Sequence, residues 1–282
     1  QIPVADREAL MREEADDGYA TTHPLSTDRI AYLTDVYQKD AAWDAKTPAA
    51  IDARFQRIKA KLAGFVDDPA QTMRTYPETD QSLPAHYARA YAWHKSAYPD
   101  KAMAETAALV KAAPHDPYFL ELQGQVLLES GKAAEAIPPL REAVRLTNSQ
   151  PLIATLLGHA LIATEDDKNY AEAENVLRAA VAKDRDNPFA WYQLGVVYEH
   201  RGDTARAALA TAERYSLEGN KPLAIRNAET AMAGLDKSSP DYLRAQDIAL
   251  ATRGEMDNAR KGKKSDKADK DGENKPQGQP IP

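Results

Sequence analysis

The six histidines are the side chains of this sequence that could most readily bind a metal or move a proton. They are His23, His86, His94, His115, His159 and His200. A zinc hydrolase site on one helix needs two histidines four residues apart, and a glutamate directly after the first of them acts as the base. No two histidines of this chain have that spacing, and none is followed by glutamate. The sequence therefore names no catalytic residue, and we expect the chain by itself to cleave no peptide bond.

Two carboxylate pairs could be mistaken for an acid–base site. These are Asp166 with Asp167, and Glu172 with Glu174. Both pairs lie at a polar edge where no apolar pocket would raise a carboxyl pKa, so we interpret them as solvated surface residues. Cysteine is absent, which excludes disulfides and thiolate metal ligands.

Small residues recur along the chain with a period that predicts paired helices. Gly124 and Gly158 are 34 residues apart, Gly195 follows 37 residues later, and Ala90 precedes Gly124 by 34. Residues 191–198 read W-x2-L-G-x2-Y, and Ala207 stands twelve residues after Gly195. This is the pattern of a tetratricopeptide (TPR) repeat, in which small residues let two antiparallel helices pack closely. The sequence predicts three or four such repeats between residues 84 and 218.

The composition favours an all-α chain in three parts. Alanine is frequent, aromatic residues make up 7%, and runs of β-branched residues are missing. We expect a helical segment at 1–77, a TPR-type solenoid of helical hairpins with a C-terminal capping helix at 78–258, and a disordered, charged tail at 259–282. After the third glycine the repeat shortens to 17 residues, so the helix at 204–217 should serve two successive units.

An amphipathic helix is predicted before the repeats. Its apolar residues step by four and three, and its opposite face is basic. The apolar residues are Ile51, Phe55, Ile58, Leu62 and Phe65, and the basic ones are Arg54, Arg57, Lys59 and Lys61.

The charge distribution indicates the kind of partner. The net charge is −7; residues 259–282 carry seven Lys/Arg and four Asp/Glu, hence +3, which leaves −10 on the rest. An acidic body argues against nucleic acid as a partner. No stretch approaches the ~18 apolar residues of a membrane span. The chain begins with Gln1, so either a leader has been removed or the sequence is a piece of a longer polypeptide.

TPR superhelices bind proteins or peptides on a concave face, to which the first helix of each repeat contributes. Rigid aromatic side chains beside polar groups at those positions suit extended or helical peptides. The candidate groove residues are Tyr87, Tyr91, His94, Glu121, Gln125, Thr155, His159, Tyr192 and Glu199. Tyr118 and Phe189 occupy similar positions, but we interpret them as packing between repeats.

Four segments carry a more specific resemblance. They read THPLSTDRI at 22–30, KAKLAGF at 59–65, YPETDQSLP at 76–84 and LRAQDI at 243–248. Together they resemble the C-terminal part of bacterial periplasmic zinc metalloproteases, in which an HExxH catalytic domain precedes TPR repeats and which act in envelope quality control. The resemblance extends over roughly residues 16–258 and implies that 1–77 adjoins a catalytic domain, which this sequence does not contain.

The resemblance also implies a cofactor, a compartment and partners. The complete protein would hold zinc, work in the periplasm, and recruit substrates or components of outer-membrane protein assembly through its repeats. In that family the His-Pro loop closes the catalytic domain near its cleft, so the resemblance makes His23 a candidate auxiliary metal ligand. The alternative is a loop histidine that only orients the start of the following helix. A different class of function also stays open, namely a free-standing TPR adaptor without any protease.

Overall fold

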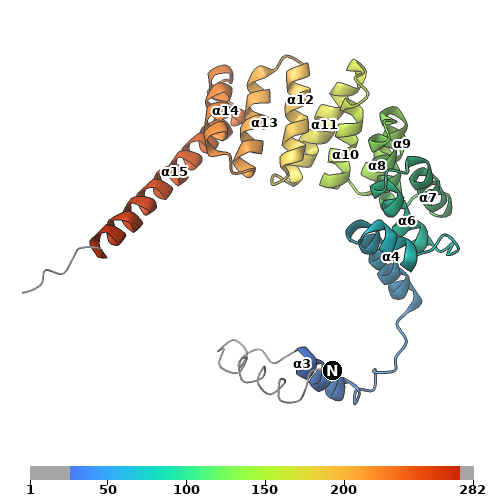
Figure 1. The fold of residues 1–282 in the computed structure, drawn as a ribbon. Helices are drawn as coiled ribbons and strands as arrows, with labels where there is room; N and C mark the ends of the chain where they lie inside the picture. Colours follow the sequence, from blue (N-terminus) through green and yellow to red (C-terminus); the bar gives the residue numbers. More distant parts are fainter. Residues whose placement is uncertain (1–25, 274–282) are drawn as a thin grey trace, which may run out of the picture. The chain divides into compact units, whose positions relative to one another are not determined.

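The computed structural model describes residues 26–273, and this part of the chain is built of helices alone. Thirteen helices follow one another in it, without a strand (Figure 1). Their bounds are α3 Ser26–Tyr37, α4 Ala49–Val66, α5 Pro69–Thr75, α6 Leu83–Lys95, α7 Pro99–Ala112, α8 Pro117–Glu129, α9 Ala133–Leu146, α10 Pro151–Ile162, α11 Asp167–Lys183, α12 Pro188–His200, α13 Thr204–Leu217, α14 Lys221–Gly234 and α15 Pro240–Glu273. Predictions that concern residues 1–25 or 274–282, including the role of His23, lie outside the described residues.

The chain divides into two compact units, Gln1–Gln56 and Arg57–Pro282, with the division inside α4. Of the first unit, the structure describes α3 and the beginning of α4. The second unit contains the repeats and is the part in which the candidate site lies.

Local sequence explains where the first helix of each hairpin begins. A polar residue caps this helix by accepting a hydrogen bond from a backbone amide, and proline follows within two positions. Proline suits the first turn because its missing N–H has no partner there in any helix. Examples are Ser82, Asp116 and Asn187, which cap α6, α8 and α12.

The second unit is a solenoid of helical hairpins packed in sequence order. In Figure 1 the hairpins α6–α7, α8–α9, α10–α11 and α12–α13 stand side by side, and each helix packs against its sequence neighbours. The all-α TPR-type solenoid predicted from the sequence is thus confirmed. As expected from the shortened repeat, α13 packs extensively against both α12 and α14.

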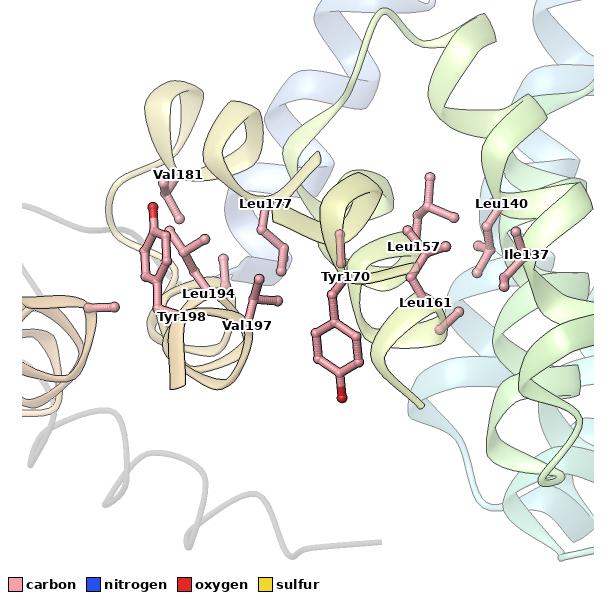
Figure 2. Packing of buried hydrophobic residues seen from close by; sticks show 14 of the residues in the cluster. Ile137, Leu140, Leu157, Leu161, Tyr170, Leu177, Val181, Leu194, Val197 and Tyr198 are labelled. Atoms are coloured by element: carbon pink, nitrogen blue, oxygen red, sulfur yellow. The ribbon is translucent and has the colours of Figure 1, made fainter. Parts of the chain in front are cut away.

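The core of the solenoid runs continuously from one hairpin to the next. Figure 2 shows Leu140 beside Leu157, and Leu177 beside Leu194 and Val197, so that side chains of four hairpin helices share one apolar layer. Two glycines make this layer possible. A Cβ on Gly124 would lie 2.3 Å from Leu140 Cγ, and a Cβ on Gly158 would lie 2.5 Å from Leu177 Cγ. The 34-residue spacing of these glycines therefore reflects a repeated leucine-over-glycine contact.

The C-terminal helix α15 packs on the end of the solenoid through its first turns. Ala245, Ile248 and Ala249 are buried against α13 and α14. The bounds of α15 extend to Glu273.

The predicted amphipathic helix exists as α4, but its apolar residues are not buried. Ile51, Phe55, Ile58, Leu62 and Phe65 are all between 56% and 62% exposed. The buried positions of α4 are Ala60 and Gly64. The usual inference that the apolar face of an amphipathic helix packs inward is wrong for this helix within the described residues.

Candidate peptide-binding groove

The first helices of the hairpins form one continuous face of the solenoid. Helix α10 contacts both α8 and α12, so these first helices lie next to one another although each is separated in sequence by a second helix. We call the surface formed by α6, α8, α10 and α12 the first-helix face. All nine groove residues predicted from the sequence belong to these four helices.

An open pocket of about 650 Å³ lies at the N-terminal end of this face. Tyr91, His94, Gln125 and Glu129 line it, together with Phe65 of α4. The Glu129 carboxylate is held from two sides, because Gln125 Nε2 donates to Oε1 at 2.9 Å and His94 Nε2 lies 2.7 Å from Oε2. Three predicted residues, Tyr91, His94 and Gln125, are thus brought together in one pocket.

A row of rings continues the first-helix face over α10 and α12. The His159 and Phe189 rings meet edge to face at 5.4 Å, and Phe189 stacks beside Tyr192 at 6.3 Å. The guanidinium of Arg214, from α13, lies 5.3 Å from the Tyr192 ring. A shallow hollow of about 270 Å³ lies here, lined by Pro188, Phe189, Tyr192, Arg214 and Glu218. Phe189 is 44% and Tyr192 45% exposed, so both rings can contact a ligand.

The electrostatics of this row follow from burial. Burial lowers the pKa of His159 below its ordinary value of 6.5, while the nearby charge of Glu129 partly offsets this. His159 therefore presents a neutral imidazole at neutral pH. A neutral ring in a row with the exposed rings of Phe189 and Tyr192 suits apolar and aromatic side chains of a peptide.

The remaining predicted groove residues differ in accessibility. Tyr87 is 1% and Tyr91 8% exposed, because α4 covers them, and Glu121 is partly buried beneath the same helix. Thr155 is buried, and its hydroxyl donates to the Pro151 carbonyl oxygen. Glu199 is exposed at the end of α12.

Several residues of the face could not have been found from repeat positions. Phe65 and Arg57 come from α4, which precedes the repeats, and Arg214 comes from a second helix. Glu129 lies on a first helix, but only its bonds to His94 and Gln125 show that it takes part. Tyr118 is 47% exposed and lies beside basic side chains of α4, so it contributes to the face rather than only to packing between repeats.

The histidines and carboxylates considered as catalytic candidates form ordinary structural pairs. His86 lies 2.5 Å from Glu105, and His200 lies 2.8 Å from Asp167. Glu172 accepts two hydrogen bonds from Arg141. Among the residues whose side chains are described, 27 and 29–258, no three His, Asp or Glu side chains are grouped so as to hold a metal ion.

Comparison with known proteins agrees with the repeat structure. A tetratricopeptide-repeat family model matches residues 99–151 and 163–225. Among solved structures, YrrB, described as a TPR protein with an unusual peptide-binding site, is 18% identical with a TM-score of 0.50, over 71% of this chain and 97% of its own. A double mutant of MamA from strain RS-1 is also 18% identical with a TM-score of 0.50, over 60% of this chain and 96% of its own. Among curated protein sequences, none matches significantly.

The fold, the repeated contacts and these matches define a class: the chain contains tetratricopeptide repeats arranged as an all-α solenoid. Solenoids of this kind bind proteins or peptides on their concave surface. None of the described helices is both long enough and apolar enough to pass through a membrane.

Proposed function

We propose that the repeats bind protein or peptide segments on the first-helix face, and that they do so as the recruiting part of a periplasmic zinc-dependent metalloendopeptidase. In this proposal the catalytic HExxH segment belongs to a part of the protein that precedes this sequence. The recruited proteins are substrates or components of outer-membrane protein assembly.

The observation that carries the binding function is the accessible part of the first-helix face. It combines the pocket around Glu129 with the exposed rings of Phe189 and Tyr192. Such a surface offers apolar contact area and fixed polar groups, which is what extended or helical peptides require. The peptide-binding site described for YrrB supports the same use of the fold.

The observation that favours an adjoining domain is the apolar stripe of α4. We use this name for Ile51, Phe55, Ile58, Leu62 and Phe65. Monomeric proteins rarely expose a contiguous row of large apolar side chains, so a row that is more than half exposed at every position indicates a surface that another part of the protein covers. Together with the segments that resemble the metalloproteases, this supports a catalytic domain at that place.

In the same proposal His23 is an auxiliary ligand of the zinc ion in the complete protein. Residues that merely orient the loop would not change metal affinity. The test is the zinc content of the full-length enzyme with and without His23→Ala, measured after dialysis; equal zinc content and equal affinity would leave His23 a structural loop residue.

The free-standing TPR adaptor is the alternative function, and the same groove supports it equally well. The coding sequence upstream of Gln1 separates the two. An HExxH helix encoded there supports the protease, and a signal peptide leading directly into Gln1 supports the adaptor. Zinc-dependent casein cleavage by the present chain would contradict both.

The binding function is tested with a peptide array. Tyr192→Ala and Gln125→Ala should each weaken the bound signals, because one removes an exposed ring and the other a group that orients Glu129. Leu250→Ala is the matched control, since Leu250 is 58% exposed on α15, outside the first-helix face. Binding that is equally strong in all three variants would refute the proposed groove.

A further inference from the structure

We propose that α4 occupies the N-terminal part of the groove as an internal ligand, and that the external partner of this part is a helix with two basic residues and an aromatic residue at four-residue intervals. The inference rests on the proposed binding function and names the kind of peptide that the groove selects. The pattern is that of Arg57, Lys61 and Phe65, which lie on one side of α4.

Arg57 is bound as a ligand side chain would be. Its guanidinium forms two hydrogen bonds with the Asp116 carboxylate, at 2.5 and 2.6 Å. Its Cζ lies 4.3 Å from the centre of the Phe119 ring, and 5.5 and 5.7 Å from the rings of Tyr118 and Tyr87. A carboxylate acceptor together with three aromatic rings within 6 Å of the guanidinium carbon makes a site for a planar guanidinium.

The pKa of Arg57 shows the same environment. Burial tends to lower the pKa, but the hydrogen bonds and the charge of Asp116 outweigh burial and raise it. The partner Asp116 is fixed in advance, because it also caps α8 by accepting from the backbone amides of Tyr118 and Phe119. The acceptor for the first basic residue is thus part of the repeat, whether or not α4 is present.

Lys61 lies over the second acidic position of the groove. Its Nζ is 5.7 Å from the Tyr118 ring, and its charge acts on Glu121. Burial raises the pKa of the Glu121 carboxyl, and Lys61 only partly reverses this. Among the described residues Lys61 and Glu121 form no ion pair within 4.0 Å. A ligand with arginine at this position would reach Glu121 better, because the arginine side chain is longer and its guanidinium can donate two hydrogen bonds to one carboxylate.

The end of α4 completes the contact. Phe65 meets the Tyr91 ring edge to face at 6.0 Å. Gly64 lets the two helices touch, since a Cβ there would lie 2.6 Å from the Ala88 carbonyl oxygen. Lys95 Nζ donates to the Phe65 and Asp67 carbonyl oxygens and so fixes the C-terminal end of α4.

The side of α4 that meets the groove therefore carries Arg57, Lys61 and Phe65. The other residues of the apolar stripe, Ile51, Phe55, Ile58 and Leu62, remain more than half exposed. The buried positions of α4 are only the small residues Ala60 and Gly64, and its large contacts are charged or aromatic. Releasing the helix therefore exposes little apolar surface to water. A second helix with the same pattern competes for the same contacts. When α4 leaves, Tyr87, Tyr91 and Glu121 become accessible, which makes the sequence-predicted groove residues of the first two repeats available to the partner.

The experiment is fluorescence anisotropy with labelled peptides and the full chain. The peptides are residues 49–66, the same peptide with Lys61→Arg, and a scrambled sequence of equal composition. The proteins are wild type, Arg57→Glu and Arg54→Glu. Arg57→Glu should release α4, because the new carboxylate repels Asp116. Arg54→Glu is the matched control, because Arg54 is an exposed residue of the same helix.

Arg57→Glu should bind the 49–66 peptide at least tenfold more tightly than wild type and Arg54→Glu, and the Lys61→Arg peptide more tightly still. Adding Glu121→Gln should abolish the preference for the Lys61→Arg peptide. Circular dichroism shows whether Arg57→Glu is folded; if it is not, Phe65→Ala, which removes only the edge contact with Tyr91, takes its place. Equal binding of the native and scrambled peptides, or no gain over wild type, would overturn the inference.

Failure of this inference is distinguishable from failure of the proposed function. If α4 is a fixed part of the fold, the 49–66 peptide will not bind, yet array peptides will still bind in a manner that depends on Tyr192. If Tyr192→Ala changes nothing either, the first-helix face is not the binding surface.

Discussion

At the scale of single residues, the repeats depend on glycines that are not equivalent. Gly124 and Gly158 each lie under a leucine, with no room for a Cβ. Gly195, which belongs to the clearest sequence match, has room, since the nearest atoms to a Cβ there are 3.7 Å away. The residue type is the same at the three positions, but the reason for it is different.

The glycines therefore predict opposite effects of alanine. Gly124→Ala and Gly158→Ala should lower the free energy of unfolding by about 1–3 kcal/mol, because buried leucines are displaced. Gly195→Ala should leave it unchanged or raise it by up to about 1 kcal/mol, because alanine is the better helix former. Urea denaturation of the three variants measures this, and a Gly195→Ala loss as large as the other two would contradict the packing described.

The lowered pKa of His159 predicts a dependence of stability on pH. In the folded state burial disfavours protonation of this imidazole, whereas in the unfolded state it takes up a proton near its ordinary pKa of 6.5. Lowering the pH below 6.5 therefore favours the unfolded state and reduces the free energy of unfolding. Wild type should thus lose unfolding free energy relative to His159→Gln when the pH is lowered from about 7 to 5. If the difference in unfolding free energy between the two proteins does not vary with pH, His159 is not desolvated. The raised pKa of Glu121 has the opposite effect on stability, but both proteins retain Glu121, so this effect cancels in the comparison.

At the scale of elements, α4 shows that an amphipathic pattern does not say which face is buried. The basic face of this helix meets a groove that is itself acidic and aromatic, through Arg57 and Lys61. Of the apolar stripe, Phe65 contacts Tyr91, and the other four residues lie on the outside. A contact with oppositely charged and ring-lined neighbours thus determined the orientation of the helix within the second unit.

Substitutions on the stripe test this orientation. Leu62→Ser and Ile58→Ser should change the free energy of unfolding by no more than about 0.5 kcal/mol, because both side chains are more than half exposed. Leu140→Ala, at a buried position of the solenoid, should cost about 2–5 kcal/mol. If the serine variants are as unstable as Leu140→Ala in thermal denaturation, the stripe is buried.

At the scale of the whole molecule, the repeats form a solenoid in which each helix depends mainly on its neighbours. The C-terminal end is joined to it by α15, where Arg244 donates two hydrogen bonds to the buried carboxylate of Glu213 in α13. Stability in such an array is a sum of local contributions, so damage at one end should remain there.

Arg244→Met should therefore loosen α13–α15 without affecting α8–α10. Glu213 then stays buried without its partner, and the free energy of unfolding should fall by about 1–3 kcal/mol. The loss is smaller than for a fully buried ion pair, because the Arg244 side chain is 43% exposed. Hydrogen exchange should accelerate in α14 and α15 and stay unchanged in α8. Arg253→Met is the control on the same helix; its pair with Glu229 is half exposed on both sides and should be worth less than about 1 kcal/mol. Faster exchange along the entire solenoid would contradict a local effect.

The sequence by itself determined the class of fold. The period of small residues at Gly124 and Gly158, and the polar residue before proline at each first helix, are local signals, because close helix packing and capping depend on residues near one another in the chain. The face that carries His94, Gln125 and Tyr192 followed from the same period. The shared role of α13 could also be predicted, since the repeat shortens visibly.

The tertiary structure alone decided which of these groove residues are accessible. Tyr87 and Tyr91 are covered because α4, a helix from outside the repeats, crosses their surface, and no period within the repeats describes that contact. It also decided that Arg57 faces the groove while most of the apolar stripe does not. This orientation depends on Asp116 and Phe119, some 60 residues away in the chain. Local spacing sets helices and their pairing, whereas contacts between distant segments set burial, and binding depends on burial.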